Sequence, residues 1–225
     1  MLNLRFVTAT RLSLEEFTAT SPLVRSLKRV SQTCHVHLDV NANNTAPLAV
    51  GFNRAIEQAK DDDVLVFIHD DVWIDDWLIS SRLAEALAVY DVVGVAGNTR
   101  REPHQEGWII HPATRAQDVG FISGAIAHGE FHTGEVSFFG KTPQEARLLD
   151  GVFLAARGGV LKQAGVQFDP QFKFHFYDTD FCRSCEASQL RVGTWPIALT
   201  HQSAGQWQSA EWNEAFALYL KKWGD

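Results

Sequence analysis

The sequence contains little cysteine and no long apolar run. Its three cysteines, Cys34, Cys182 and Cys185, are odd in number and cannot form a disulfide framework, which favours a reducing compartment. No apolar run approaches the ~18 residues that a membrane span requires, and residues 1–5 do not begin a signal peptide. We therefore expect a cytoplasmic protein without a transmembrane segment, at most peripheral to the inner membrane.

Basic residues are also scarce. The 20 Lys and Arg residues are outnumbered by 27 Asp and Glu residues, which gives a formal net charge of −7. A sequence-independent grip on nucleic acid or on an anionic membrane needs clustered basic side chains, so both functions are disfavoured. A diphosphate bound by such an acidic protein is most readily neutralised by a metal ion. The 225 residues show no internal repeat and predict one domain.

One apolar run ends in a histidine and two carboxylates. Residues 64–68 are all apolar and are followed by His69, Asp70 and Asp71. This pattern predicts a strand buried on both faces of a parallel sheet, whose carboxyl end is where open α/β sheets bind ligands. Adjacent carboxylates repel each other, and a cation that holds a diphosphate would stabilise both. Alternatively, the aspartates only cap the next helix, although residues 75–76 can fill that role.

The first half of the chain alternates between strand and helix patterns. The predicted strands are 4–10, 34–40, 64–68 and 92–96, and the predicted helices begin near residues 13, 22, 47 and 75. This alternation predicts an α/β fold with a mostly parallel, doubly wound sheet. The pattern then becomes irregular. Residues 107–111 and 121–127 could be strands of a small antiparallel sheet, whereas 128–142 has no assignable structure and is expected to be a lid or binding loop.

Polar residues follow three later apolar or aromatic segments. They are Asp150 and Gly151 within the strand pattern 148–156, Asp178 and Asp180 after the aromatic run 172–177, and His201 after the strand pattern 192–199. Carboxylate oxygens together with an imidazole suit Mn²⁺ or Mg²⁺, and the histidine favours manganese. Asp178 would then be available as a general base. Each residue also has an ordinary alternative, with Asp178 as a helix cap and His201 as a solvated or core histidine.

A last helix is predicted after Ser209. It places Trp212, Phe216, Tyr219, Leu220 and Trp223 on one face. This apolar face either packs on the domain or covers a neighbouring subunit of a homo-oligomer.

In this order and spacing, the motifs resemble those of GT-A fold glycosyltransferases, specifically the bacterial family-2-like group. The resemblance covers most of the chain outside residues 99–147. It consists of a helix motif at 51–56, a DxD-like segment at 66–72, an acceptor-side motif at 149–154, a catalytic-base segment at 177–183 with Gly193, and a final histidine, His201, with Ser203 and Gly205. It implies one GT-A-like domain over 1–225, with a nucleotide-binding half (1–98) and an acceptor-side half that includes the C-terminal helix (99–225).

The resemblance also implies roles for individual residues. Asp71 would be the principal metal ligand, His201 would complete the metal site, and Asp178 would be the catalytic base. The nucleotide, sugar or acceptor would be contacted by Asp39, Asn41, Asn53, His69, Asp70, Asp150 and Gly151. A single base implies transfer with inversion, from a nucleotide-diphosphate sugar, with a UDP-sugar favoured, to a hydroxyl of a glycan or another acceptor.

The sequence departs from the family pattern in three places. His69 stands where the DxD segment has a carboxylate, and Tyr177 stands where the family usually has glutamate. The first strand pattern lacks the usual proline-threonine signature, so it does not specify the base of the nucleotide. These departures keep a non-catalytic module that binds a sugar nucleotide or a glycan as the alternative function.

Two further enzyme classes can be compared with the motifs. A P-loop NTPase needs G-x-x-x-x-G-K-[ST] before the acidic strand, but Gly134 and Gly140 are separated by five residues and follow that strand. A metal-dependent phosphohydrolase could use the same aspartate pair and would cleave a donor without an acceptor. A shared metal site requires the imidazole of His201 to lie within about 10 Å of the Asp71 carboxylate.

Overall fold

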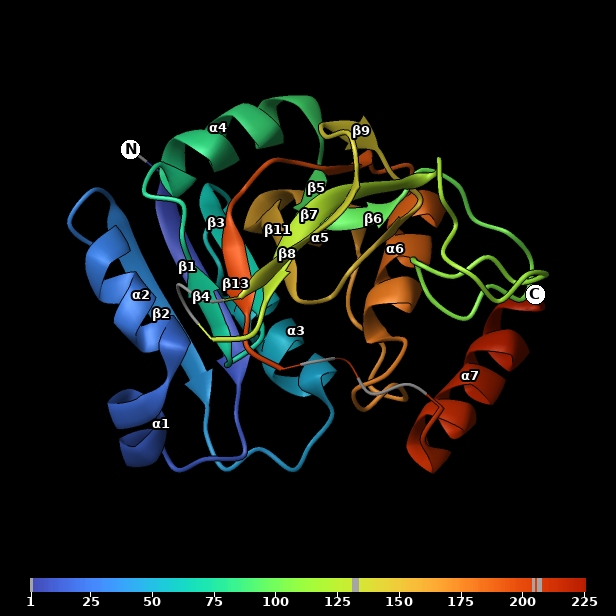
Figure 1. Ribbon diagram of the computed structural model, residues 1–225. Coiled ribbons are helices and arrows are strands. Elements are labelled where there is room, and N and C mark those ends of the chain that lie inside the picture. The colour runs from blue at the N-terminus through green and yellow to red at the C-terminus, as the bar shows by residue number, and fades with distance from the viewer. Residues whose placement is uncertain (1, 131–133, 204, 206–207) are drawn as a thin grey trace.

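The computed structural model describes residues 2–130, 134–203, 205 and 208–225, which form two β-sheets covered by helices (Figure 1). The first sheet has the strand order β2-β1-β3-β11-β5-β12-β9. Its strands are β1 (Asn3–Ala9), β2 (His35–Asn41), β3 (Asp63–Ile68), β5 (Val92–Gly94), β9 (Gln144–Glu145), β11 (Phe153–Arg157) and β12 (Val192–Thr194). Strands β2, β1 and β3 are parallel, whereas β11 runs antiparallel between β3 and β5. The predicted α/β class is confirmed, with a parallel core inside a mixed sheet.

The second sheet is smaller and mostly antiparallel, and it has the order β10-β6-β7-β13-β4, with β8 paired to β7. Its strands are β4 (Val72–Ile74), β6 (Ala96–Asn98), β7 (Ile122–His128), β8 (Glu135–Gly140), β10 (Leu148–Leu149) and β13 (Leu199–His201). The strand predicted at 121–127 is therefore confirmed as β7.

Two predictions for the irregular region are wrong. Residues 107–111 form turns, with one isolated bridge between Ile110 and Gln117. The segment 128–142, expected to be a loop, contains the edge strand β8, and its residues 131–133 lie outside the described part. Edge strand β8 lacks the usual buried apolar face, since Val136 and Phe138 are about 70% exposed. Its sequence therefore shows no hydrophobic periodicity that would distinguish a strand from a loop.

Several connections lead from one sheet to the other, and we call four of them the sheet junction. They are residues 69–71 between β3 and β4, 95 between β5 and β6, 150–152 between β10 and β11, and 195–198 between β12 and β13. The single strands predicted at 92–96, 148–156 and 192–199 are each divided by it. Hydrophobic periodicity does not reveal a bend when both sides of the bend are buried. The junction gathers the polar residues of these segments in one region.

The described helices are α1 (Leu14–Thr20), α2 (Pro22–Val30), α3 (Leu48–Gln58), α4 (Ile79–Val89), α5 (Gly158–Ala164), α6 (Tyr177–Ala187) and α7 (Ala210–Trp223). Three of them, α1, α2 and α7, begin at a serine that caps them. Ser13 and Glu16 form a capping box at α1, and Ser21 caps α2. Helix α4 begins at Ile79, later than predicted, and Asp76 accepts a hydrogen bond from the Leu78 amide just before it. Among the described helices, none combines the length and the apolar character that a bilayer span needs.

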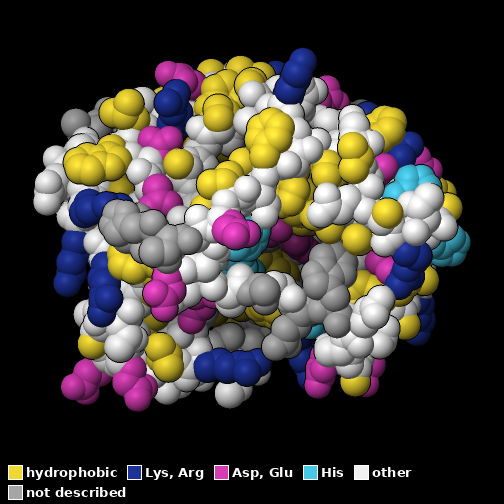
Figure 2. Space-filling view, in the orientation of Figure 1, with side chains coloured by type: hydrophobic (Ala, Val, Ile, Leu, Met, Phe, Trp, Pro, Cys, Tyr) yellow, Lys and Arg dark blue, Asp and Glu magenta, His cyan; other side chains and the backbone are white. Residues whose placement is uncertain are grey.

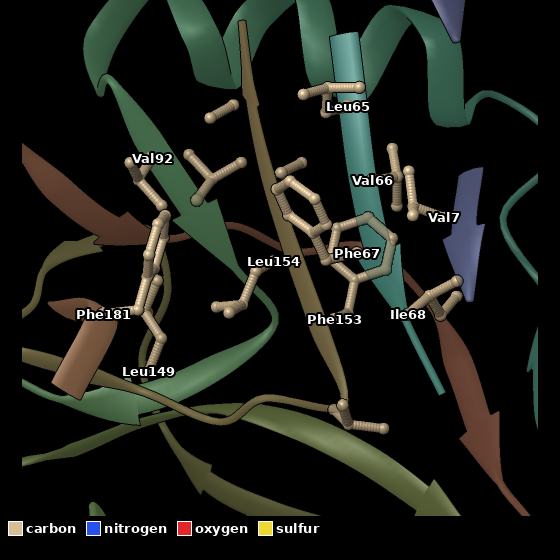
Figure 3. Packing of buried hydrophobic residues seen from close by; sticks show 14 of the residues in the cluster. Val7, Leu65, Val66, Phe67, Ile68, Val92, Leu149, Phe153, Leu154 and Phe181 are labelled. Atoms are coloured by element: carbon tan, nitrogen blue, oxygen red, sulfur yellow. The ribbon is translucent and has the colours of Figure 1, made fainter. Parts of the chain in front are cut away.

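The core lies around β3, all six residues of which are buried, as predicted for this strand. Leu154 of β11 pairs in register with Phe67 of β3, and Phe153 pairs with Ile68, so one pair packs on each face of the sheet (Figure 3). Phe168 stacks on Phe181 with ring centroids 4.1 Å apart, which extends this core to α6. The strand that carries His69–Asp71 at its end is therefore held from both faces.

Helix α7 packs on the same chain. The Phe176 ring, immediately before α6, contacts Trp212, Phe216 and Tyr219 at centroid distances of 5.1, 5.4 and 5.4 Å. The Trp223 indole donates a hydrogen bond of 2.8 Å to Asp180. The apolar face that could have served a homo-oligomer is thus used inside the domain, the first of the two predicted alternatives.

Candidate active site

The candidate site lies at the sheet junction, where β3 ends and β4 begins. Strand β13 pairs antiparallel with β4 and places His201 opposite Val72, next to Asp71. The Nε2 atom of His201 is 3.2 Å from Oδ1 of Asp71, and the Ser203 amide donates to Oδ2 at 3.2 Å. The imidazole and the carboxylate are therefore close enough for a shared metal site. Figure 2 shows histidine and acidic side chains in a hollow near the centre of this face.

The charges of Asp71 and His201 support each other. Burial favours the neutral acid, but the hydrogen bonds from His201 and Ser203 and the charge of His201 hold the pKa of Asp71 well below its usual range. Burial alone would lower the pKa of His201, whereas the hydrogen bond and charge of Asp71 raise it. The carboxylate of Asp71 is consequently ionised throughout the physiological pH range, as a cation ligand must be.

His69 supplies a third donor atom to this cluster. One ligand atom each from His69, Asp71 and His201 all lie within 4.8 Å of one another, and Nδ1 of His69 is 3.4 Å from Nε2 of His201. Burial and the neighbouring His201 lower the pKa of His69, so its imidazole is neutral near pH 7. Two imidazole nitrogens and one carboxylate oxygen fit Mn²⁺ better than Mg²⁺, which prefers oxygen ligands. The sequence had placed His69 only among the nucleotide contacts.

Asp70 lies beside the cluster without joining it. Its side chain is half-buried, and its backbone carbonyl accepts a hydrogen bond of 3.0 Å from the Ser21 hydroxyl. The ribose contact that the motif predicts for its side chain stays a prediction.

A second group of polar residues adjoins the cluster through Tyr177, the first residue of α6. Its hydroxyl lies 3.1 Å from Nε2 of His69 and donates to the Gly151 carbonyl at 2.7 Å. The amide of the same glycine donates to Oδ2 of Asp178 at 2.9 Å. Gly151 thus connects the cluster at β3 with the carboxylate at the start of α6.

Asp178 does not cap α6 as the ordinary alternative expected. The residue at the N-cap position is Phe176, with φ 64°, and its side chain makes no capping hydrogen bond. Burial and the nearby charge of Asp150 raise the pKa of Asp178 to about 6, against the opposing hydrogen bonds from Thr179 and Gly151. This pKa is that of a carboxylate that is ionised at neutral pH and still basic enough to accept a proton.

Asp150 is oriented by a tryptophan that sequence reasoning missed. Its Oδ2 accepts a hydrogen bond of 2.8 Å from the Trp108 indole, and its Oδ1 accepts one of 2.8 Å from the Val152 amide. Trp108 belongs to the turns at 99–121 and packs edge-on against Phe139 of β8. No local pattern links Trp108 to Asp150, because they meet only through the second sheet.

The residues predicted to contact the nucleoside follow the first sheet and lie outside the three-donor cluster. Asp39, on β2, forms an ion pair with Arg5 at 2.7 Å. Asn41, at the end of β2, donates to the Thr8 carbonyl at 3.0 Å. Asn53 both donates to and accepts from the backbone of Phe168, at 2.8 Å each. The Asn53 amide therefore ties α3 to the segment before α6, a structural role that the sequence had not indicated.

Two more groups near the site behave differently from expectation. Asp180 faces α7, where Trp223 and Lys222 contact it, and so it takes no part in the cluster. His128, which was not predicted, is paired in register with His201 across β7 and β13, with ring centroids 6.1 Å apart. It sits at the end of a strand whose sequence gave no polar signal besides the histidine itself.

Comparisons with known proteins agree with this fold. Two solved structures have the same fold: GalNAc-T7 with UDP, GalNAc and Mn²⁺ (10% identity, TM-score 0.55) and a mutant Drosophila β1,4-galactosyltransferase 7 with manganese, UDP-Gal and xylobiose (13% identity, TM-score 0.53). The alignments cover 100% and 96% of this chain, and 48% and 79% of those chains. The chain therefore spans about half the length of GalNAc-T7.

No curated protein gives a significant sequence match. The family comparison is decisive instead, because residues 15–219 match the model of a glycosyltransferase-like family. This match includes every residue of the three-donor cluster and Asp178, and the two structural matches confirm the predicted GT-A fold. The chain belongs to the glycosyltransferase-like family.

Proposed function

We propose that the protein transfers a sugar from a nucleotide-diphosphate sugar to a hydroxyl acceptor, with inversion and with a divalent cation. The observation that carries this function is the arrangement of the three-donor cluster and Asp178 around Gly151. The donor atoms of the cluster lie within 4.8 Å of one another. Gly151 connects Asp178 to this cluster, because its amide donates to Asp178 and its carbonyl accepts a hydrogen bond from Tyr177, which contacts His69.

The cation would be held by His69, Asp71 and His201. Mn²⁺ fits this donor set best, and Mg²⁺ is the alternative. When bound, the cation would neutralise the diphosphate that leaves with the nucleotide. The two solved structures of the same fold contain UDP or UDP-Gal with manganese, which supports a UDP-sugar as donor.

Asp178 would act as the general base. A raised pKa of about 6 leaves it ionised at neutral pH and suited to accept the proton of an acceptor hydroxyl. Asp150, held by Trp108, would orient the transferred sugar or the acceptor beside it. One base acting on one hydroxyl corresponds to direct displacement and therefore to inversion at the anomeric carbon.

The two halves of the domain would divide the substrates between them. Residues 1–98 would bind the nucleotide through Asp39, Asn41, Asn53, His69 and Asp70. Residues 99–225 would bind the acceptor, with Gly151 where the two halves meet in the folded domain.

The described cysteines are unpaired and buried, which supports a reducing compartment such as the cytoplasm.

Product formation tests the function directly. The full chain is incubated with Mn²⁺, a panel of UDP-sugars and a library of hydroxyl acceptors, and products are identified by mass spectrometry. We expect Asp178→Asn to lower transfer by roughly 10²-fold or more while donor binding by calorimetry stays near wild type. Asp71→Asn should abolish Mn²⁺-dependent donor binding, and the exposed Asp62→Asn is the matched control that should leave both unchanged.

Three results would contradict this function. Donor binding without transfer or hydrolysis under any acceptor would favour a non-catalytic sugar-nucleotide module. Equal donor cleavage with and without acceptor, at wild-type rate in Asp178→Asn, would indicate a phosphohydrolase. Loss of donor binding together with transfer in Asp178→Asn would remove the role of base from this residue.

A further inference from the structure

The Tyr177 hydroxyl lies between an imidazole nitrogen and a carbonyl oxygen. It is 2.7 Å from the Gly151 carbonyl and 3.1 Å from Nε2 of His69. A hydroxyl has one proton to donate, whereas a carbonyl oxygen can only accept. Because the shorter contact is to the carbonyl, the tyrosine proton lies there, and the hydrogen bond to His69 must be donated by the imidazole.

This direction of donation determines the tautomer of His69. A neutral imidazole carries a single N–H, so a proton on Nε2 leaves the lone pair on Nδ1. Nδ1 is the atom that lies 3.4 Å from Nε2 of His201, inside the three-donor cluster. We propose that Tyr177 is a positioning residue that holds His69 in the Nε2–H tautomer and so directs the Nδ1 lone pair at a divalent cation, which rests on the proposed function.

The surroundings keep Tyr177 in this position. Its side chain is 3% exposed, and its ring packs against Phe52 and Phe168, with centroids 6.1 Å away in each case. A β-carbon on residue 151 would collide with the tyrosine hydroxyl, so the contact requires glycine there. The residue that replaces the family's usual glutamate is therefore fitted to Gly151 and to His69 together.

Two of the departures from the family pattern, His69 and Tyr177, complement each other in this arrangement. A histidine in the DxD-like segment can bind a cation through Nδ1 only if its other nitrogen keeps the proton. Tyr177 provides an acceptor for that proton at 3.1 Å, at the position where His69 needs it. His69 and Tyr177 thus act as a pair.

The test begins with the metal-free protein. Nitrogen NMR of ¹⁵N-histidine-labelled protein distinguishes protonated from unprotonated ring nitrogens, and His69→Gln identifies the His69 signals. We expect Nε2–H in the wild type and a shift toward Nδ1–H in Tyr177→Phe, because the acceptor that remains in the cluster is then the Asp71 carboxylate. Tyr219→Phe is the matched control, since it removes a buried hydroxyl of α7 that contacts Arg183 of α6, and it should leave His69 unchanged.

Mn²⁺ affinity, measured by electron paramagnetic resonance, provides the second readout. We expect Tyr177→Phe to weaken Mn²⁺ binding by about 10- to 100-fold, the usual cost of losing a residue that orients a metal ligand, with no change in Tyr219→Phe. An unchanged tautomer, or an equal loss of affinity in both variants, would overturn the role of Tyr177. Failure of the wild type to bind Mn²⁺ would instead refute the cation of the proposed function, while the tautomer measurement would still decide the role of Tyr177.

Discussion

Asp178 illustrates how one side chain acquires its properties from its neighbours. In isolation an aspartate has a pKa of 3.8, and the backbone amides of Thr179 and Gly151 would lower it further. Burial and the charge of Asp150 outweigh those hydrogen bonds and raise the pKa to about 6. The folded protein therefore holds this proton more tightly than the unfolded chain does.

This difference predicts a pH dependence of stability. Between pH 4 and pH 6 the unfolded chain has already released the Asp178 proton while the folded protein retains it, so the free energy of unfolding falls as pH rises. Asparagine does not titrate, so the free energy of unfolding of Asp178→Asn does not fall in this way. Relative to wild type, the metal-free variant should gain up to about 3 kcal/mol between pH 4 and pH 7 in urea unfolding.

The exposed Asp62→Asn serves as the control and should show a constant difference from wild type over the same pH range. A constant difference for Asp178→Asn as well would mean that its pKa is not raised.

At the scale of elements, α7 fixes the beginning of α6. Phe176 precedes α6 and lies among the aromatic rings of α7. Asp180, which is completely buried in the first turn of α6, receives hydrogen bonds from Trp223 and Lys222. Because Tyr177 and Asp178 lie between these two anchored residues, α7 contributes to the geometry of the site without touching it.

Removal of the Lys222 charge should therefore destabilise the fold. Lys222 lies 2.7 Å from both Asp180 and Asp169, and burial raises the pKa of Asp180 against the effect of that lysine. Lys222→Met keeps the aliphatic part but leaves a buried carboxylate without its cation. We expect a loss of about 1–3 kcal/mol in chemical unfolding at pH 7.

The neighbouring Lys221 is exposed, and Lys221→Met provides the comparison, with an expected change within about 0.5 kcal/mol. Equal effects of the two substitutions would indicate that the charge of Lys222 does not stabilise α7 on α6.

At the scale of the whole molecule, the sheet junction joins the two sheets into one unit. The four connections of the junction pass between them, and His69 and Val152 in two of these connections are joined by a backbone hydrogen bond of 3.2 Å. Neither sheet can lose its strands without displacing residues of the other.

The chain is consequently expected to unfold in one cooperative transition. Urea unfolding followed by tryptophan fluorescence and by far-ultraviolet circular dichroism should give coincident curves. The tryptophans report on both sheets, since Trp108 contacts β8 and Trp195 lies in the connection from β12 to β13. Two separated transitions would show that the sheets fold independently.

The sequence by itself determined the elements and the family. The buried run before His69 predicted β3, Ser13, Pro22 and Ser209 marked three helix starts, and the order of motifs predicted the GT-A fold. These features are local, because they depend on periodicity, capping and spacing along the chain. From the sequence, only the resemblance to a family indicated that Asp71 and His201 lie together in one site.

Only the tertiary structure decided which side chains share the site. It divided three predicted strands at the sheet junction, added His69 to the donors, connected Tyr177 to Gly151 and joined Asp150 to Trp108. It also directed Asp180 to α7 and Asn53 to the backbone of Phe168. Each of these contacts joins residues that are distant in sequence, and a local pattern carries no information about which distant segment will lie beside it.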